Sequence, residues 1–269
     1  MERKWAQIKS VPSAPFVLTL PSPMPKERLD QLMHRRGLCD SRETAKRLIL
    51  AGEVRVEGLE GNLKPGLKVD DEAAIEVKNR PKYVSRGGLK LEKALDEFAV
   101  DVAGKVVLDA GASTGGFTDC VLQRGAAKVY AYDVGTNQLA WKLRSDPRVD
   151  SQEGFNLRHL QPGDLPEPVD LVVIDVSFIS LTLILGPVFG VLKPEGEVIC
   201  LIKPQFELKK EQIGKGGIVR DPALHEEAVE KIRTHVTGTL GKCWQGLVAS
   251  PISGTDGNTE FLAWLKHPA

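Results

Sequence analysis

The stretch that most constrains the fold runs from Lys105 to Gly116 and reads KVVLDAGASTGG. Residues 105–108 form a short run rich in β-branched side chains, which is typical of a buried parallel strand. The strand ends at Asp109, and the glycines that follow allow a tight turn with no Cβ to block a ligand. The helix expected at 117–123 begins with free N–H groups that face the same crevice. Strand, glycine turn and helix together predict a nucleotide-type site.

The type of nucleotide can be narrowed by what this loop lacks. Ser113 replaces the second glycine of a G-x-G-x-x-G motif, and no Walker-type G-K-[ST] follows. Neither a dinucleotide nor ATP is therefore the natural ligand. An acid followed by AGASTGG suits a ligand with an amino-acid end and no pyrophosphate. The next strand, expected at 129–132, ends in Asp133, whose carboxylate can bind both hydroxyls of an adenosine ribose. The alternative is an ordinary strand, turn and helix with a chance glycine cluster.

Charge is balanced over the 269 residues but is unevenly distributed along the chain. Residues 1–90 hold 18 Lys and Arg against 12 Asp and Glu, whereas the remainder holds 18 against 24. A basic surplus at the front predicts a polyanionic partner for the N-terminal part rather than for the whole protein. The length exceeds that of one average domain and is enough to bury a sizeable core.

The cysteines, the apolar runs and the N-terminus indicate the compartment. Cys39, Cys120, Cys200 and Cys243 lack C-x-x-C spacing, so we expect neither a disulfide nor a metal site. No apolar run approaches the roughly 18 residues of a membrane span. Residues 1–23 are rich in proline and have no A-x-A cleavage site, which argues against a signal peptide. We expect a loosely ordered extension at 1–23 and a cytoplasmic, monomeric protein that does not bind membranes.

From Lys26 the pattern becomes helical, and Gly37 is expected to end this first helix. Asp40 is a plausible N-cap for a second helix, because Glu43 follows at the capping-box spacing. Short strands are expected at 54–56 and 74–77. The sequence RLDQLMHRRGLCDSRETAKRLILAGEVRVEG resembles the S-four-type RNA-binding domain, which implies a small α+β RNA-binding domain at residues 24–78.

Basic residues on the two expected helices are the RNA-binding candidates of this domain. Arginines and lysines on two helix faces can span adjacent phosphates of a folded RNA and bind them in a salt-dependent manner. The alternative is that these side chains only solvate the polar faces of the helices. The candidates are Arg28, Arg35, Arg36, Arg42, Lys46 and Arg47.

A linker with proline and paired glycines is expected at 79–88, and a larger domain at 89–269. Strands and helices alternate through this domain, which predicts a doubly wound parallel sheet. A closing hairpin adds one antiparallel edge strand, the arrangement typical of methyltransferases. A polar loop at 209–220 is a candidate lid over RNA, although its charges are equally consistent with a solvated loop.

Charged residues gather at one edge of the expected sheet. Asp109, Asp133, Asp175 and Lys203 each follow a parallel strand, and Glu260 begins the final antiparallel strand. Ligands of such sheets bind at the carboxyl ends of the strands. Lys90, on the helix before the first strand, can fold back over the same edge. We therefore expect Lys90, Asp175, Lys203 and Glu260 to form one constellation.

The chain resembles the TlyA (haemolysin A) family of ribosomal RNA 2′-O-methyltransferases, within the FtsJ-like enzymes that share a Lys-Asp-Lys-Glu tetrad. The resemblance runs from about residue 26 to 265, and it is carried by the segments SRGGLK, LDAGASTGGF, YDVGTNQLAW, VIDVSFISL, LIKPQF, GKGGIVRD and GNTEF. It implies a Rossmann-like class I methyltransferase domain that uses S-adenosylmethionine. It assigns the catalytic tetrad to Lys90, Asp175, Lys203 and Glu260, which are all present.

The resemblance implies roles for these residues. Lys203 is the expected general base for the ribose 2′-hydroxyl, although free lysine has a pKa of about 10.4 and must be held neutral to act near pH 7.5. Desolvation, Lys90 and the sulfonium of the cofactor can favour the neutral amine. Asp175 and Glu260 are expected to aim the amine and hold Lys90. The expected cofactor contacts are Asp109, Gly111, Ser113, Thr114, Gly115, Gly116, Asp133, Val134, Phe155 and Asn156.

The resemblance also implies cytidine in ribosomal RNA of one or both ribosomal subunits as the substrate, and no metal is expected. A non-catalytic RNA-binding factor of ribosome assembly is a second hypothesis, but such a protein has no reason to keep two lysines and two acids at one edge. A membrane-lytic protein, suggested by the older family name, is a third, and no amphipathic or spanning segment supports it.

Overall fold

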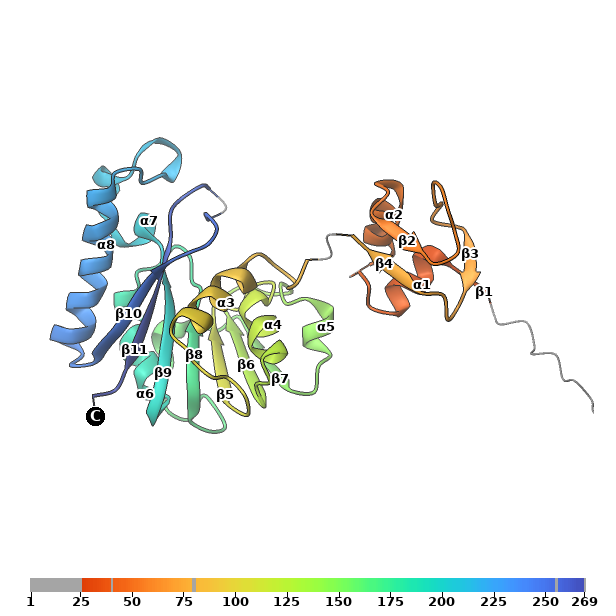
Figure 1. Cartoon of the computed structure of the whole chain (residues 1–269). Helices are drawn as coiled ribbons and strands as arrows, with labels where there is room; N and C mark the ends of the chain where they lie inside the picture. The colour runs from red at the N-terminus through yellow and green to blue at the C-terminus, as the bar shows by residue number, and fades with distance from the viewer. Residues whose placement is uncertain (1–25, 40, 79–80, 255, 269) are drawn as a thin grey trace, which may run out of the picture. The chain divides into compact units, whose positions relative to one another are not determined.

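The computed structural model describes residues 26–39, 41–78, 81–254 and 256–268 (Figure 1). The chain divides into two compact units, of which the second begins at residue 80. The extension expected at 1–23 lies outside the described residues. So do Asp40 and the first two residues of the expected linker.

The first unit is a small α+β module with its own core. Its elements are β1 (Lys26–Arg28), α1 (Leu29–Arg35), α2 (Arg42–Leu50), β2 (Val54–Val56), β3 (Lys68–Asp70) and β4 (Ile75–Val77). The strands form two antiparallel pairs, β1 with β3 and β2 with β4. Leu29, Leu32 and Met33 of α1 pack against Ala45 and Ile49 of α2. The apolar one-turn spacing therefore forms the interface between the two helices.

Two local predictions in this unit were wrong. Residues 26–28 form a strand that pairs with residues 68–70, so the first helix begins only at Leu29. A three-residue strand carries too little periodicity to be recognised in the sequence. Its partner strand also lies some forty residues away, so no local turn signals the pairing. The second helix is capped by Ser41, whose Oγ accepts a hydrogen bond from the N–H of Thr44 at 3.1 Å, and not by Asp40.

The second unit is a three-layer α/β structure. Its strands are β5 (Val106–Ala110), β6 (Lys128–Asp133), β7 (Val149–Glu153), β8 (Val169–Ile174), β9 (Leu192–Ile202), β10 (Cys243–Ala249) and β11 (Phe261–Lys266). Its α-helices are α3 (Gly87–Glu97), α4 (Gly116–Gln123), α5 (Trp141–Arg144), α6 (Leu185–Gly190), α7 (Pro204–Glu207) and α8 (Pro222–Thr234). Short 3-10 turns and a π-helical turn at His235–Thr239 complete it.

The strands form one seven-stranded sheet in the order β10-β11-β9-β8-β5-β6-β7. The strands β9, β8, β5, β6 and β7 run parallel to one another. The antiparallel strand is β11, which lies between β9 and β10. The doubly wound sheet with its closing hairpin is as predicted, but the edge strand is β10 and not the antiparallel strand. The hairpin inserts its second strand beside β9 and leaves its first outside.

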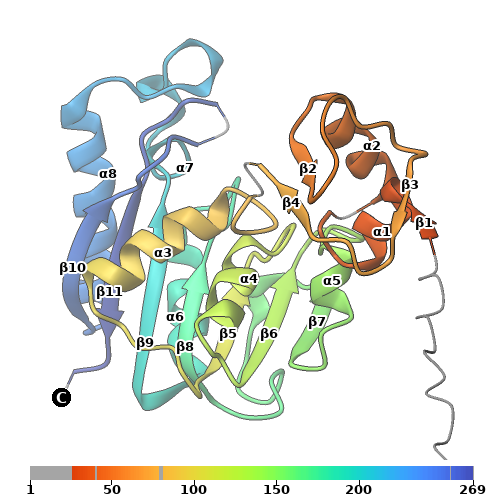
Figure 2. The same ribbon diagram turned by 45° about the vertical axis from the view of Figure 1, so that its right-hand side comes forward.

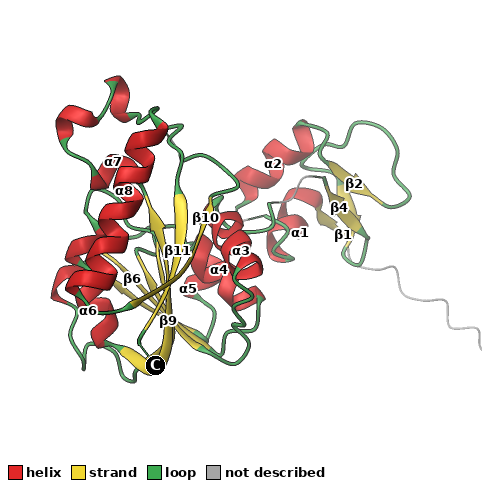
Figure 3. Ribbon diagram, turned by 60° about the vertical axis from the view of Figure 1, so that its left-hand side comes forward, coloured by secondary structure: helices red, strands yellow, loops and turns green. Residues whose placement is uncertain are grey.

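Helices cover both faces of this sheet (Figure 3). On one face α3 and α4 lie side by side, and they pack on Val107, Leu171 and Ile199 (Figure 2). On the other face α6 and α8 pack on the alternate residues, such as Leu108 and Val172. Because successive strand residues point to opposite faces, both faces of these apolar strands are buried.

Two helices of the second unit end within longer apolar runs. The helix before β9 ends at Gly190, and β9 begins at Leu192. The last long helix is α-helical only to Thr234, and a π-helical turn follows. Apolar residues continue across both boundaries, so the hydrophobic pattern could not locate them. Within the described ranges, no helix is both long and apolar enough to cross a bilayer.

Candidate active site

The loop between β5 and α4 is built for close approach. Gly111 has φ +90°, and a Cβ there would lie 2.7 Å from the carbonyl oxygen of Asp175. Ser113 also has a positive φ, of 47°, which is uncommon for a residue other than glycine. Such strain is found mainly at functional sites. The loop lies at the carboxyl end of β5, close against the backbone of Asp175.

Asp109 supports this loop from inside the protein. Its side chain is fully buried, and Oδ2 accepts hydrogen bonds from the N–H and the hydroxyl of Thr118 at 2.8 and 2.6 Å. Oδ1 has no hydrogen-bond partner among the described residues. Burial raises the pKa of Asp109 to about 7. A carboxyl this deep positions the first turn of α4 and does not line the cavity beside it.

Asp133 supports the same loop from the neighbouring strand. Oδ2 accepts from the N–H of Ser113 at 2.8 Å, and Oδ1 accepts from the N–H of Gly135 at 2.6 Å. The loop and the end of the neighbouring strand are therefore in direct contact, through residues that lie 20 positions apart in the chain. Each carboxylate oxygen can accept further hydrogen bonds, so ligand hydroxyls could still be bound.

The other expected cofactor residues lie around this core. Gly115 packs against Leu143, Val134 is exposed, and Phe155 is half-buried against the ring of Tyr132. Asn156 caps a short 3-10 helix through a hydrogen bond from the N–H of Arg158 at 3.1 Å. None of these four lines the cavity described below.

The expected tetrad comes from four separate elements. Lys90 lies in the first turns of α3, whereas Asp175 and Lys203 directly follow β8 and β9. Glu260 precedes β11, whose first residue pairs with the last residue of β9. This antiparallel register brings Glu260 next to the end of β9, although it lies 58 positions beyond Ile202 in the chain.

Within the tetrad the charges form two pairs. Lys203 Nζ lies 2.7 Å from Asp175 Oδ1 and donates a hydrogen bond to Ser177 Oγ at 2.9 Å. The first contact is an ion pair by distance, but Asp175 Oδ1 has no hydrogen bond of regular geometry among the described residues. Lys90 Nζ donates to Glu260 Oε2 in a buried pair. Removing either partner of such a pair would leave a charge with little access to water.

All four side chains line one cavity of about 480 Å³, within the size range of small-molecule sites. Of the expected cofactor residues, Gly111, Ser113, Thr114 and Gly116 line it too. The tetrad and the glycine loop therefore share one site. The cavity is large enough for a small ligand, and the backbone around Gly111 leaves no room for a side chain.

Sequence reasoning missed several residues of the cavity wall. Phe178 is 89% exposed, has φ +63° and lies 5.1 Å, centroid to centroid, from the ring of Phe206. Others are Ser85, Arg86, Ser177, Gln205 and Asp256. Most of them follow or precede a tetrad residue within five positions, and this proximity was the available signal.

The loop expected to act as a lid is tied to the tetrad side of the site. Asn258 is buried, accepts from the N–H of Val219 at 2.8 Å and donates to the carbonyl oxygen of Gly217 at 2.9 Å. One end of the loop is therefore fixed two residues from Glu260. Whether the rest of it covers RNA stays a prediction.

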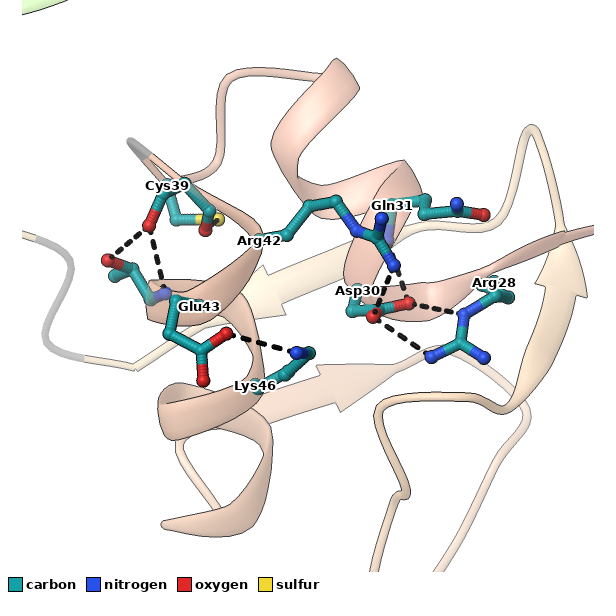
Figure 4. Close-up of polar contacts among 9 residues, drawn as sticks. Arg28, Asp30, Gln31, Cys39, Arg42, Glu43 and Lys46 are labelled. Atoms are coloured by element: carbon teal, nitrogen blue, oxygen red, sulfur yellow. Dashed lines mark hydrogen bonds and ion pairs between the residues drawn. The ribbon is translucent and has the colours of Figure 1, made fainter.

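The basic residues of the first unit have diverse partners. Arg28 and Arg42 both contact the buried carboxylate of Asp30 (Figure 4). Arg36 donates to the carbonyl oxygens of Asp71 and Ala73, which gives it a structural role. The remaining candidates are Arg35, which pairs with Glu27, Lys46, which pairs with Glu43, and Arg47, which is exposed.

A metal site finds no support in the described part of the chain, where no cluster of three His, Cys, Asp or Glu side chains could hold an ion.

The fold and the site together define a class of protein. A seven-stranded sheet with one inserted antiparallel strand and a glycine loop at the end of an inner parallel strand is the architecture of Rossmann-like methyltransferases.

Comparison with known proteins agrees with this class. Residues 83–267 match the FtsJ-like methyltransferase family, and residues 27–59 match the S4 domain. The chain is 46% identical to the 16S/23S rRNA (cytidine-2′-O)-methyltransferase TlyA of Mycobacterium tuberculosis, over 90% of each chain. It is 45% identical to Hemolysin A of Brachyspira hyodysenteriae, over 88% of this chain and 98% of the relative.

A solved structure shares the arrangement. It is a candidate hemolysin from Streptococcus thermophilus, with a TM-score of 0.68 and 49% identity over 92% of this chain and 90% of that one. This chain therefore belongs to the TlyA family of FtsJ-like methyltransferases, with an S4 domain at its N-terminal side.

Proposed function

We propose that this chain methylates the 2′-hydroxyl of a ribose in ribosomal RNA, with S-adenosylmethionine as the methyl donor. One observation carries the proposal: Lys90, Asp175, Lys203 and Glu260 meet as two ion pairs at a single cavity beside the glycine loop. The activity for which the Mycobacterium tuberculosis relative is named supports ribosomal RNA as the substrate and cytidine as the target nucleoside.

The loop residues fit the cofactor. Gly111, Ser113, Thr114 and Gly116 would surround its methionine end, because they line the cavity and leave the backbone accessible. Asp133 would take the ribose hydroxyls with the acceptor capacity that its two backbone hydrogen bonds leave. Val134, Phe155 and Asn156 would lie toward the adenine. Asp109 and Gly115 would act from behind, by fixing the loop.

The tetrad would handle the proton of the reacting hydroxyl. Lys203 Nζ lies at the cavity wall and would accept that proton as general base, while Asp175 and Ser177 hold the amine in place. Glu260 would hold Lys90 at the opposite pair. Bound S-adenosylmethionine would supply an electrophilic methyl group and a sulfonium charge that favours a neutral amine nearby.

The aromatic residues at the cavity suit the rest of the substrate. Phe178 projects into solvent, and Phe206 lies beside it. Nucleobases taken out of a helix commonly stack on such exposed rings. We infer that the base of the target nucleotide rests on Phe178 while its ribose reaches Lys203.

The first unit would supply affinity for RNA through its basic side chains, which act on phosphates. Ribosomes are assembled in the cytoplasm, so we infer that the chain acts there. Neither RNA binding by the first unit nor methyl transfer by the second requires a second copy of the chain. We therefore propose a monomeric enzyme whose partners are ribosomal subunits.

The test is methylation of ribosomal subunits from cells that lack this enzyme, with labelled S-adenosylmethionine and nucleoside mass spectrometry. The wild-type chain should produce 2′-O-methylcytidine. Lys203→Ala should lower the rate by about 10²- to 10⁴-fold, the range for loss of a general base. Binding of the cofactor, measured by calorimetry, should change by less than about threefold, because Lys203 acts on the hydroxyl.

Lys93→Ala is the matched control, because Lys93 lies on α3 beside Lys90 but pairs with Glu97 at the surface. It should methylate at the wild-type rate. A base-methylated nucleoside would contradict the ribose as target, and near-normal methylation by Lys203→Ala would refute the general-base role.

A further inference from the structure

The first unit holds two arginines on one buried carboxylate. Asp30 is fully buried at the start of α1 (Figure 4). Arg28 donates to both of its oxygens, from Nε at 2.9 Å and from Nη2 at 3.0 Å. Arg42 Nη2 donates to Asp30 Oδ2 at 3.3 Å. A single carboxylate therefore joins the end of β1 to the first turn of α2.

The two guanidinium groups remain accessible. The side chains of Arg28 and Arg42 are 43% and 48% exposed, whereas that of Asp30 is not exposed at all. Arg28 uses two of its three nitrogens on Asp30, and Arg42 uses one. N–H donors are therefore left on both side chains. Two positive charges share one negative charge, so the cluster keeps a net positive charge.

We propose that Asp30 is a positioning residue that holds Arg28 and Arg42 side by side for the phosphates of RNA. This inference rests on the proposed function, because it assumes that the first unit binds ribosomal RNA. An unrestrained arginine loses side-chain entropy when it is fixed on a phosphate. Asp30 fixes both side chains before RNA binds. The two hydrogen bonds from Arg28 to Asp30 also fix the orientation of the guanidinium plane.

The other ion pairs of this unit lack these features. Glu43, which pairs with Lys46, is 84% exposed, and Glu27 pairs with Arg35 near the surface. Each of these acids contacts one cation through a flexible side chain.

Hydrogen bonds from Arg28, and then from Arg42, lower the pKa of Asp30 despite its burial. The carboxylate therefore stays charged, and keeps both arginines, over the physiological pH range.

Simple electrostatics and a positioning role of Asp30 predict opposite effects of the substitution Asp30→Asn on the affinity for RNA. Asp30→Asn removes a negative charge next to two arginines, so Coulomb attraction alone predicts tighter binding of RNA. If Asp30 acts by positioning, the freed arginines must be ordered again on binding, and affinity falls. We expect binding to weaken by about three- to tenfold, because part of the side-chain entropy returns.

The experiment uses the full chain and, as probe, ribosomal subunits from cells that lack this enzyme. Dissociation constants are measured at several salt concentrations for the wild type, Asp30→Asn and the matched control Glu43→Gln. The control should bind as tightly as the wild type, or slightly more tightly. Unchanged or tighter binding by Asp30→Asn would overturn the inference. Absence of binding by the wild type would instead refute the proposed function.

A double-mutant cycle separates positioning from a folding defect. Asp30→Asn is compared again in a chain that carries Arg28→Gln and Arg42→Gln. If Asp30 acts through the two arginines, it should have no further effect on binding in that background. The same loss of affinity in both backgrounds would mean that Asp30 acts through the fold, and the inference would be wrong.

Discussion

The two units use buried carboxylates in different ways. In the first unit, Asp30 is buried but the arginines that it holds are nearly half exposed. In the second unit the lysine side chains are also largely enclosed, with 10% exposure for Lys90 and 11% for Lys203. An exposed cation can meet a phosphate and is screened by salt, whereas an enclosed one can act only on a group that enters the cavity. The position of the cation therefore separates binding from chemistry.

The largest effect is expected when a carboxylate is removed from an enclosed ion pair. Glu260→Ala leaves the ammonium of Lys90 buried without its partner, and we expect a loss of about 3–5 kcal/mol in the free energy of unfolding. The measurement is urea unfolding of the full chain, followed through the second unit. Lys90→Met added to Glu260→Ala should recover part of this loss, because it removes the stranded charge.

Glu97→Ala is the control for Glu260→Ala, since Glu97 makes an exposed pair with Lys93 on the same helix as Lys90. It should cost less than about 1 kcal/mol. Equal losses for the two variants would mean that enclosure of the pair is energetically unimportant.

Asp109 differs from the carboxylates compared so far, because it is buried and no cation contacts it among the described residues. Its pKa is raised to about 7 by burial, so above pH 4 the folded state keeps a proton that the unfolded state releases. Stability should therefore fall by about 3 kcal/mol between pH 5 and pH 8. Asp109→Asn, which cannot ionise, should remove this part of the pH dependence.

The measurement is urea unfolding at constant ionic strength at pH 5, 6, 7 and 8. Asp150→Asn, at an exposed position of β7, serves as the control and should keep the wild-type pH profile. An identical profile for the wild type and Asp109→Asn would show that Asp109 is ionised throughout this range.

The smallest effect is expected for an exposed pair of the first unit. Lys46→Ala removes the contact with Glu43, which is 3.0 Å long and open to water on both sides. The free energy of unfolding should change by less than about 0.5 kcal/mol, as for other surface pairs on helices. Thermal unfolding of the full chain measures it, and a change above 1.5 kcal/mol would show that exposure does not set the strength of these pairs.

Local patterns predicted the strand ends and therefore much of the site. The apolar runs before Asp109, Asp133, Asp175 and Lys203 are continuous, because their strands are buried on both faces. Parallel strands put their carboxyl ends at the same edge, so the sequence alone places these residues together. Fewer local signals exist for three-residue strands, and the pairing of β1 with β3 was missed for that reason.

The chain's residue order by itself determined the doubly wound sheet, the glycine loop at its centre and the basic surplus of the N-terminal part. Only the tertiary structure decided which cation meets which carboxylate: Lys90 meets Glu260 across 170 positions, and Asp30 gathers two arginines. It also decided that Asp109 lies beneath the loop rather than at the cavity. Hydrophobic periodicity is a local property of the chain, whereas burial and ion pairing depend on which distant segments the folded chain brings together.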